Sequence, residues 1–247
     1  MQHIDLLWTG GWDSTFRLLE AVLQQRLTVQ PHYVIDDPPR PSTDAELAAM
    51  ARIRAGALLL DPAAEDRILP TVVQHRTAVP RDEQIRQAYK AVMQQVYIGG
   101  QYVWLAEYAL SKGIRLELAI HVDDRAHLAI KDHVESVDDG FGSTYAVRPG
   151  DDSPNAILFR QFRFPILRLS KLDMQARATE HGYAHLLEET WFCHTPRAGK
   201  PCGLCAPCQF AIQEGLGRRV PANRRLLYRV LAPYLRAKTL AARWRAR

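Results

Sequence analysis

Eleven residues near the start of the chain decide its fold: Ile4-Asp5-Leu6-Leu7-Trp8-Thr9-Gly10-Gly11-Trp12-Asp13-Ser14. The apolar run over 4–8 is typical of a short buried strand, and apolar residues recur at helical spacing from Asp13 to about Gln25. The two glycines between them let the backbone turn tightly, where a Cβ would obstruct it. We therefore expect a strand, a close turn and a helix.

The same alternation continues along the chain and predicts an α/β fold with a doubly wound, mainly parallel sheet. Apolar runs predict further strands, and helical spacing predicts the helices between them. The expected strands cover 32–35, 57–61 and 116–120, with an extended segment at 159–164. The expected helices cover 43–54, 82–96, 101–112, 125–136, 170–182 and a tail from about 223.

Composition agrees with a globular protein, since 47% of the 247 residues are hydrophobic and 24% are charged. No run of about eighteen apolar residues occurs, so we expect no spanning helix and no membrane partner. Residues 1–5 lack the charged start and apolar stretch of a signal peptide, which predicts a cytoplasmic protein.

Charge is distributed unevenly. Ten basic residues and no acidic residue follow Glu214, and removing those ten from the 32 basic residues leaves 22 against 27 acidic ones, a net charge of −5. The basic residues of this tail are Arg218, Arg219, Arg224, Arg225, Arg229, Arg236, Lys238, Arg243, Arg245 and Arg247. Apolar residues at helical spacing accompany them, and Pro233 is expected to kink or split the helix. Such a helix either docks on the acidic body or on a second copy of the chain, or binds an acidic protein or a nucleic acid.

The turn at residues 9–14 has the chemistry of a phosphate-binding loop. The following helix presents unpaired N–H groups and the positive end of its dipole, and both attract anions. Ser14 and Thr15 add hydroxyl groups, and Asp13 can hold Mg²⁺. The alternative is an ordinary strand-to-helix turn in which Asp13 only caps the helix.

This loop resembles the Ser-Gly-Gly-x-Asp-Ser motif of the PP-loop ATP pyrophosphatases, with Thr9 in place of the first serine. The resemblance implies that ATP binds with Mg²⁺ near Asp13, that AMP is transferred to an acceptor, and that Asp13 and Ser14 act in catalysis. The residues it assigns to ATP are Trp8, Thr9, Gly10, Gly11, Trp12, Asp13, Ser14 and Thr15.

All four cysteines of the chain fall within sixteen residues, at Cys193, Cys202, Cys205 and Cys208. Four thiolates at this spacing suit a closed tetrahedral zinc site, which has a structural role because no coordination position stays open. A [4Fe–4S] cluster on the same residues is the main alternative. The predicted organisation is an ATP-binding domain over 1–190, a zinc segment over 191–215 and a basic helical tail over 216–247.

Together the loop and the cysteine spacing resemble the 7-cyano-7-deazaguanine synthase family of queuosine biosynthesis, and the similarity extends over Phe164-Pro165-Ile166, Ser170-Lys171 and 188–193. The resemblance implies activation of 7-carboxy-7-deazaguanine by ATP, amide formation with ammonia, and dehydration to the nitrile with a second ATP.

The middle of the chain differs from that family, at Ile35-Asp36-Asp37-Pro38, at 98–101 and at His121-Val122-Asp123-Asp124. We expect His121, Asp123 and Asp124 to face the acceptor, because ligands of open α/β sheets lie beyond the carboxyl ends of strands, and Lys171 to join the substrate site through a contact with phosphate. Together with His127, the first three also have the residue types of a metal site, or of an exposed first helical turn. The altered segments leave open a relative that joins a deazapurine to a protein amine in antiviral defence, a tRNA-thiolating enzyme, or a nucleotide-binding module without turnover.

Overall fold

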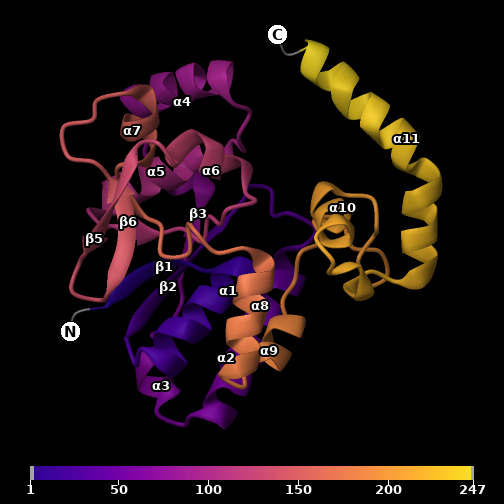
Figure 1. Ribbon diagram of the computed structural model, residues 1–247, viewed down its shortest axis with the longest axis horizontal. Coiled ribbons are helices and arrows are strands. Elements are labelled where there is room, and N and C mark those ends of the chain that lie inside the picture. Colours follow the sequence, from indigo (N-terminus) through magenta and orange to yellow (C-terminus); the bar gives the residue numbers. More distant parts are fainter. Residues whose placement is uncertain (1–2, 246–247) are drawn as a thin grey trace.

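The protein is described by a computed structural model that covers the backbone of residues 3–245 and the side chains of residues 3–233. Figure 1 shows helices on both sides of a central sheet, with the cysteine segment and the last helix to one side. The elements follow in the order β1 (Ile4–Leu7), α1 (Trp12–Leu19), η1 (Glu20–Gln24), β2 (Val29–Ile35), α2 (Thr43–Leu60), α3 (Ala64–Arg67), β3 (Val72–His75), η2 (Arg76–Ala78), α4 (Glu83–Gln95), α5 (Gln101–Lys112), β4 (Leu116–Glu117), α6 (Arg125–Ile130), β5 (Val134–Asp138), β6 (Ser143–Val147), α7 (Pro154–Phe159), β7 (Phe162–Arg163), α8 (Lys171–Glu180), α9 (Ala184–Glu188), α10 (Ala206–Gln213), η3 (Gly217–Arg219) and α11 (Ala222–Arg245).

The main sheet has five strands in the order β3-β2-β1-β4-β7, and every neighbouring pair is parallel. The chain moves outward from β1 to β3 and then returns to the other side of β1 at β4. This arrangement confirms the α/β class with a parallel sheet and is compatible with a doubly wound fold. The carboxyl ends of β1 and β4, which lie side by side, mark the point where the strand order reverses.

Each face of the sheet is covered by its own apolar core. One core joins β1 to α1, α2, α8 and α9, and the other joins β4 and β7 to α4, α5, α6 and α7. The two helix groups lie on opposite sides of the strands in Figure 1. Most of the body is therefore held together by burial of aliphatic and aromatic side chains.

A buried ion pair fastens α1 to β4 within this body. Arg17 Nε and Nη2 donate to the Glu117 carboxylate at 2.8 and 3.0 Å, and Arg17 Nη1 donates to Glu20 at 3.2 Å. Glu20 begins the π-helical turn η1 that continues α1. The pKa of Arg17 is raised: burial lowers it, but the charges of Glu117 and Glu20 outweigh that effect.

Two predicted helices agree closely with the structure. The helix expected over 82–96 is α4, whose N-cap Asp82 accepts a hydrogen bond from the Ile85 amide at 2.9 Å. The helix expected over 101–112 is α5, which ends where Gly113 adopts a φ of +65°. Side-chain caps and a left-handed glycine are local signals, so the sequence alone locates these ends.

The strand predicted over 57–61 is wrong, because α2 continues through Leu60 and the third strand is β3, over Val72–His75. Leucine is a strong helix former, and the run 58–60 is too short for its type to be read from hydropathy. Gly56 does not end the helix. A Cβ there would lie 2.3 Å from Leu186 Cδ2, so glycine makes room for α9.

Three further boundaries differ from the prediction. The helix expected over 125–136 stops at Ile130, because Val134–Asp138 pairs with β6 as an antiparallel hairpin. The strand expected over 116–120 is hydrogen-bonded as β4 only at Leu116–Glu117, and the extended segment expected from residue 159 begins at β7. Pairing with a distant partner decides all three, and no local pattern reports it.

The basic tail begins as expected, with α11 starting at Ala222 and Pro233 inside the helix rather than splitting it. Tyr228 is buried and its hydroxyl accepts from Gln213 Nε2 at 2.8 Å, while Leu226 and Val230 are 63% and 69% exposed. The side chains of Arg236, Lys238, Arg243, Arg245 and Arg247 lie outside the described residues. Within 3–245, no helix combines the length and apolar character needed to cross a membrane.

Candidate nucleotide site and metal centre

The loop between β1 and α1 bends tightly over α2. Gly10 adopts a φ of +67°, and a Cβ there would lie 2.9 Å from the carbonyl oxygen of Glu46. Its own carbonyl accepts a hydrogen bond from the Trp191 amide at 2.8 Å. Gly11 is extended and forms the N-cap of α1. The loop therefore needs glycine at position 10 for both conformation and space, and it delivers the start of α1 to the carboxyl end of the sheet.

Asp13, on the first turn of α1, forms an ion pair with Lys171. Both carboxylate oxygens of Asp13 accept from Lys171 Nζ, at 3.1 and 3.3 Å. On the other side of the ammonium group lies Glu214, whose Oε2 is 3.3 Å from Nζ. Burial lowers the pKa of Lys171, but the charges of Asp13 and Glu214 more than offset this, and the net pKa is raised. The lysine is therefore a fixed positive charge beside the loop.

The segment after β4 brings two predicted residues to the same place. His121 is buried, and its Nε2 lies 3.9 Å from Asp13 Oδ2. The Asp123 amide donates to His121 Nδ1 at 3.2 Å, so a neutral ring carries its proton on Nε2, the nitrogen that faces Asp13. The Asp123 side chain itself is 57% exposed.

Asp124 is the N-cap of α6 and accepts from the Ala126 amide at 2.8 Å. Burial raises its pKa, and the negative charge of Asp13 adds to that effect. Tyr102 on α5 is buried, and the pKa of its hydroxyl is raised by burial and by the charge of Asp124. The carboxyl ends of β1 and β4 thus carry a compact polar group around Asp13.

Of the other predicted ATP-binding residues, Ser14 keeps its side chain in the loop, whereas Trp8 and Thr15 bury theirs in the core. The Ser14 hydroxyl stays in the loop, where it donates to the Gly11 carbonyl at 3.4 Å and lies 3.4 Å from the Thr9 amide. Trp8 Nε1 donates to Thr15 Oγ1 at 3.0 Å, and both residues are fully buried. These two side chains therefore stabilise the loop from beneath, and their polar groups are already paired.

Trp12 faces the C-terminal part of the chain. The Arg219 guanidinium lies 5.4 Å from the Trp12 ring and 4.9 Å from the Phe192 ring. Only 7% of the Arg219 side chain is exposed, and burial lowers its pKa to about 10. Cation–π contact of this kind strengthens when the cation is removed from water.

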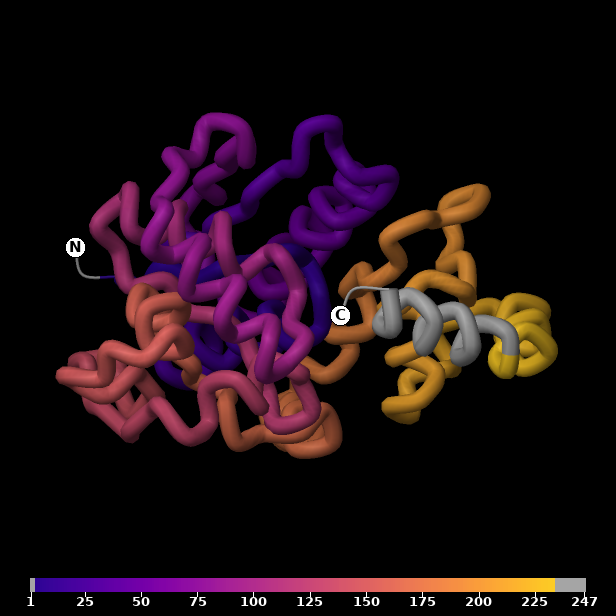
Figure 2. The backbone as a smooth tube through the Cα atoms, turned by 90° about the horizontal axis from the view of Figure 1, so that it is seen from above, coloured from indigo at the N-terminus to yellow at the C-terminus, as the bar shows by residue number. Residues whose placement is uncertain are grey.

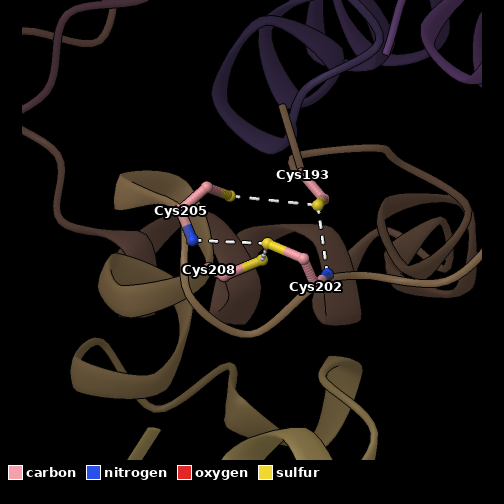
Figure 3. Close-up of side chains that lie close together, drawn as sticks. All are labelled: Cys193, Cys202, Cys205 and Cys208. Carbon is pink, nitrogen blue, oxygen red and sulfur yellow. Dashed lines mark hydrogen bonds between the residues drawn. The ribbon is translucent and has the colours of Figure 1, made fainter. Parts of the chain in front are cut away.

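The four cysteines converge as predicted, and their sulfur atoms lie within 4.8 Å of one another (Figure 3). The distance is 3.9 Å between Cys202 and Cys208 and 3.8 Å between Cys193 and Cys205. Four sulfurs bound tetrahedrally to zinc at about 2.3 Å lie about 3.8 Å apart. All four cysteines are free thiols, and their spacing fits a metal such as zinc.

Backbone N–H groups donate hydrogen bonds to sulfur atoms of this cluster. The Leu204 and Cys205 amides donate to Cys202 Sγ at 3.4 and 3.3 Å, and the Thr195 hydroxyl donates to it at 3.3 Å. Burial raises the pKa of Cys202, but these hydrogen bonds outweigh it and the net pKa is lowered. These hydrogen bonds favour the thiolate at Cys202, whereas burial raises the pKa of Cys193 and the hydrogen bond with Cys205 raises the pKa of Cys208.

The string at 121–127 does not form a second metal site. Among the residues whose side chains the structure describes, the cysteines are the only group of three or more His, Cys, Asp or Glu residues placed to hold an ion. Asp123 faces solvent, and Asp124 serves as a helix cap. Residues 121–127 thus form a polar strand end and a first helical turn.

Two residues of this region were not predicted from sequence. Glu214 is the last acidic residue of the chain and follows α10, and Arg219 was counted only as part of the basic tail. The change from mixed to purely basic charge after Glu214 was the available signal. Only the tertiary structure shows that Glu214 contacts Lys171 and that Arg219 contacts Trp12.

A comparison of the chain with models of protein families finds no match, and a comparison with curated proteins finds none either.

Proposed function

We propose that the protein is an ATP-dependent ligase of the PP-loop pyrophosphatase type. In this proposal it adenylates a carboxylated 7-deazapurine and forms a C–N bond, converting 7-carboxy-7-deazaguanine and ammonia to 7-cyano-7-deazaguanine. The carrying observation is the position of the glycine loop and the Asp13–Lys171 pair, at the carboxyl ends of β1 and β4 where the strand order reverses. Open α/β sheets bind their ligands at this point.

The loop and Lys171 suit a triphosphate. The N-terminus of α1 offers N–H groups and a positive dipole end, and Lys171 adds a full positive charge. These groups stabilise the charge that develops on departing pyrophosphate. Because Lys171 now neutralises Asp13 and Glu214, an incoming phosphate would compete with two carboxylates for its ammonium group.

The donor set at Asp13 fits Mg²⁺, which prefers carboxylate and hydroxyl oxygens. Asp13 would hold the ion, with the Ser14 hydroxyl beside it, and the ion when bound would neutralise phosphate charge. His121 and Asp124 lie on the side of Asp13 that belongs to β4, where the acceptor would bind. A neutral His121 presents its Nε2–H toward this group.

Two successive adenylations would convert the acceptor to the nitrile. An acceptor carboxylate oxygen attacks the α-phosphorus of ATP and pyrophosphate leaves; ammonia then displaces AMP, with loss of a proton, to give the amide. The amide oxygen then attacks the α-phosphorus of a second ATP, with departure of pyrophosphate and loss of one N–H proton, and elimination of AMP with loss of the second N–H proton leaves the nitrile. The four thiolates would hold a structural zinc with no open position, so they take no part in these steps.

The test is pyrophosphate release by the purified, zinc-loaded protein, with ATP, Mg²⁺, 7-carboxy-7-deazaguanine and ammonia, and with each omitted in turn. We expect continuous release only in the complete mixture; without ammonia, release should stop at about one pyrophosphate per protein, because adenylation precedes amide formation. Asp13→Asn should lower the rate about 100-fold, the effect of losing one group that stabilises charge in the transition state. Asp66→Asn, which alters an exposed carboxylate on α3, is the matched control and should leave the rate unchanged.

The outcomes separate the parts of the proposal. Calorimetry without ATP binding would overturn the nucleotide site itself. ATP binding without stimulation by the deazapurine would overturn the acceptor. Stimulation by a protein amine in place of ammonia would assign the conjugating reaction, and a brown iron–sulfur protein would favour thiolation over nitrile formation.

A further inference from the structure

Residues 191–219, which include the four cysteines, touch the glycine loop at two places and reach it at a third through Lys171. The Trp191 amide donates to the Gly10 carbonyl at 2.8 Å. The Arg219 guanidinium contacts the rings of both Trp12 and Phe192. Glu214 pairs with Lys171, which in turn pairs with Asp13. Residues 10, 12 and 13 of the loop are thus each connected to residues that follow α9.

Two of these contacts are linked to predicted metal ligands through short stretches of structure. The Trp191 indole N–H donates to the Cys193 carbonyl at 2.8 Å. Helix α10 starts directly after Cys205, contains Cys208, and is followed at once by Glu214. An eight-residue helix is a short rigid rod, so the position of Glu214 depends on how the two cysteines are held.

Arg219 makes the most specific of the three contacts. Its Nη2 donates to the Thr190 hydroxyl at 2.8 Å and to the Thr190 carbonyl, while Nε lies 3.6 Å from Glu188. A planar guanidinium can donate at its edge and stack with both of its faces at the same time, whereas a lysine ammonium cannot. The arginine therefore fixes Trp12, the residue that begins α1, against the cysteine segment.

We propose that metal binding at the four cysteines and nucleotide binding at the glycine loop are positively coupled, with Arg219 as a positioning residue that carries the coupling. This inference rests on the proposed nucleotide site. The metal orders residues 191–219, which hold Gly10, Trp12 and Lys171 in the arrangement that a triphosphate binds. Coupling is reciprocal, so the nucleotide must tighten metal binding by the same factor.

The first measurement is the affinity for a non-hydrolysable ATP analogue with Mg²⁺, by calorimetry, on zinc-loaded and metal-free protein. We expect binding about tenfold weaker without zinc, within the usual range of coupling between sites. Zinc affinity, measured against a chromophoric chelator, should rise by the same factor when the analogue is present. Circular dichroism checks that the metal-free body stays folded: its two cores contain no cysteine, and of their buried members only Ala211 and Leu216 lie within 191–219.

The second measurement uses two neighbouring arginines that both pair with Glu188. Arg219→Lys keeps the charge and removes the planar contact with Trp12, and Arg218→Lys makes the same change in a side chain that is 48% exposed. With zinc bound, we expect Arg219→Lys to weaken binding of the ATP analogue about tenfold. We also expect that the analogue no longer raises the zinc affinity of this variant. Arg218→Lys should behave as the wild type.

The results distinguish this inference from the proposed function. Zinc-loaded wild-type protein that binds no analogue would overturn both. Equal analogue binding with and without zinc, or an Arg219→Lys variant that keeps full reciprocal coupling, would overturn the coupling alone and leave the nucleotide site standing. A merely structural role for Arg219 would lower stability without changing how the nucleotide affects zinc affinity.

Discussion

The α/β body and the cysteine segment are stabilised by different forces. The body has an extended apolar core on each face of its sheet. The segment has a small cluster whose buried members are Cys193, Cys202 and Cys208, with a few partly buried neighbours. Two further residues of the segment, Ala211 and Leu216, belong to one of the body's cores. Figure 2 shows it lying to one side of the body. A chain of this length can therefore combine a part that folds by burial with a part whose order depends on its ligand.

The largest effect on the body is expected from Phe162→Ala. Phe162 is fully buried on β7, with its ring centroid 6.2 Å from Phe159 and 6.4 Å from Phe164. Truncation leaves a cavity in the core on this face of the sheet and should lower the free energy of unfolding by about 3–5 kcal/mol. Denaturant unfolding measures this, and zinc content should stay the same. Leu59→Ala, at a side chain that is 87% exposed, is the control; equal losses would contradict a core role for Phe162.

A smaller effect on the body is expected from Cys208→Ser, which removes one of the four sulfurs. We expect zinc binding to be lost and limited proteolysis to cut within 193–219, because the segment has few apolar contacts of its own. The unfolding free energy of the body should change by less than about 2 kcal/mol, well below the cost of a core cavity. Cooperative unfolding of the whole chain on metal loss would show that the two regions are one folding unit.

The smallest effect is expected from Asp151→Asn on the surface of the body. The Ser153 hydroxyl and His133 lower the pKa of Asp151 to about 2, and the Ser153 amide adds to this. A carboxyl pKa below its unfolded value contributes stability that is present above about pH 4 and is lost as the pH falls toward 2. The variant should lose less than about 1 kcal/mol at pH 7, because the group is partly exposed, and nothing at pH 2. Thermal unfolding across this range measures the difference, and a constant deficit at every pH would contradict the ionic origin.

Local signals in the sequence were sufficient for the elements that carry them. Asp82 and Gly113 mark helix ends by capping, and the Gly10-Gly11 pair marks the turn after the first strand. Where a partner decides the conformation, the sequence was misleading. Gly56 belongs inside a helix because Leu186 packs against it, and 134–138 is a strand because β6 lies beside it.

In the candidate site, too, some features follow from local sequence signals and others depend on distant residues. The spacing of the cysteines predicted a shared metal site, because thiolates separated by two or eight intervening residues reach a common centre through local turns. The position of Asp13 at a helix start followed equally from the sequence. That Lys171 lies between Asp13 and Glu214, however, depends on the first residue of α8 and the residue after α10 meeting across the molecule.

The sequence by itself thus determined the α/β class, the glycine turn and the cysteine centre, all of which depend on backbone preference, hydrophobic periodicity and ligand spacing within a few tens of residues. Only the tertiary structure decided that β1 and β4 are neighbours, that Thr15 is buried beneath the loop, and that Arg219 stacks on Trp12. The physical reason is that these contacts join residues separated by many positions, or depend on which side of an element faces the core.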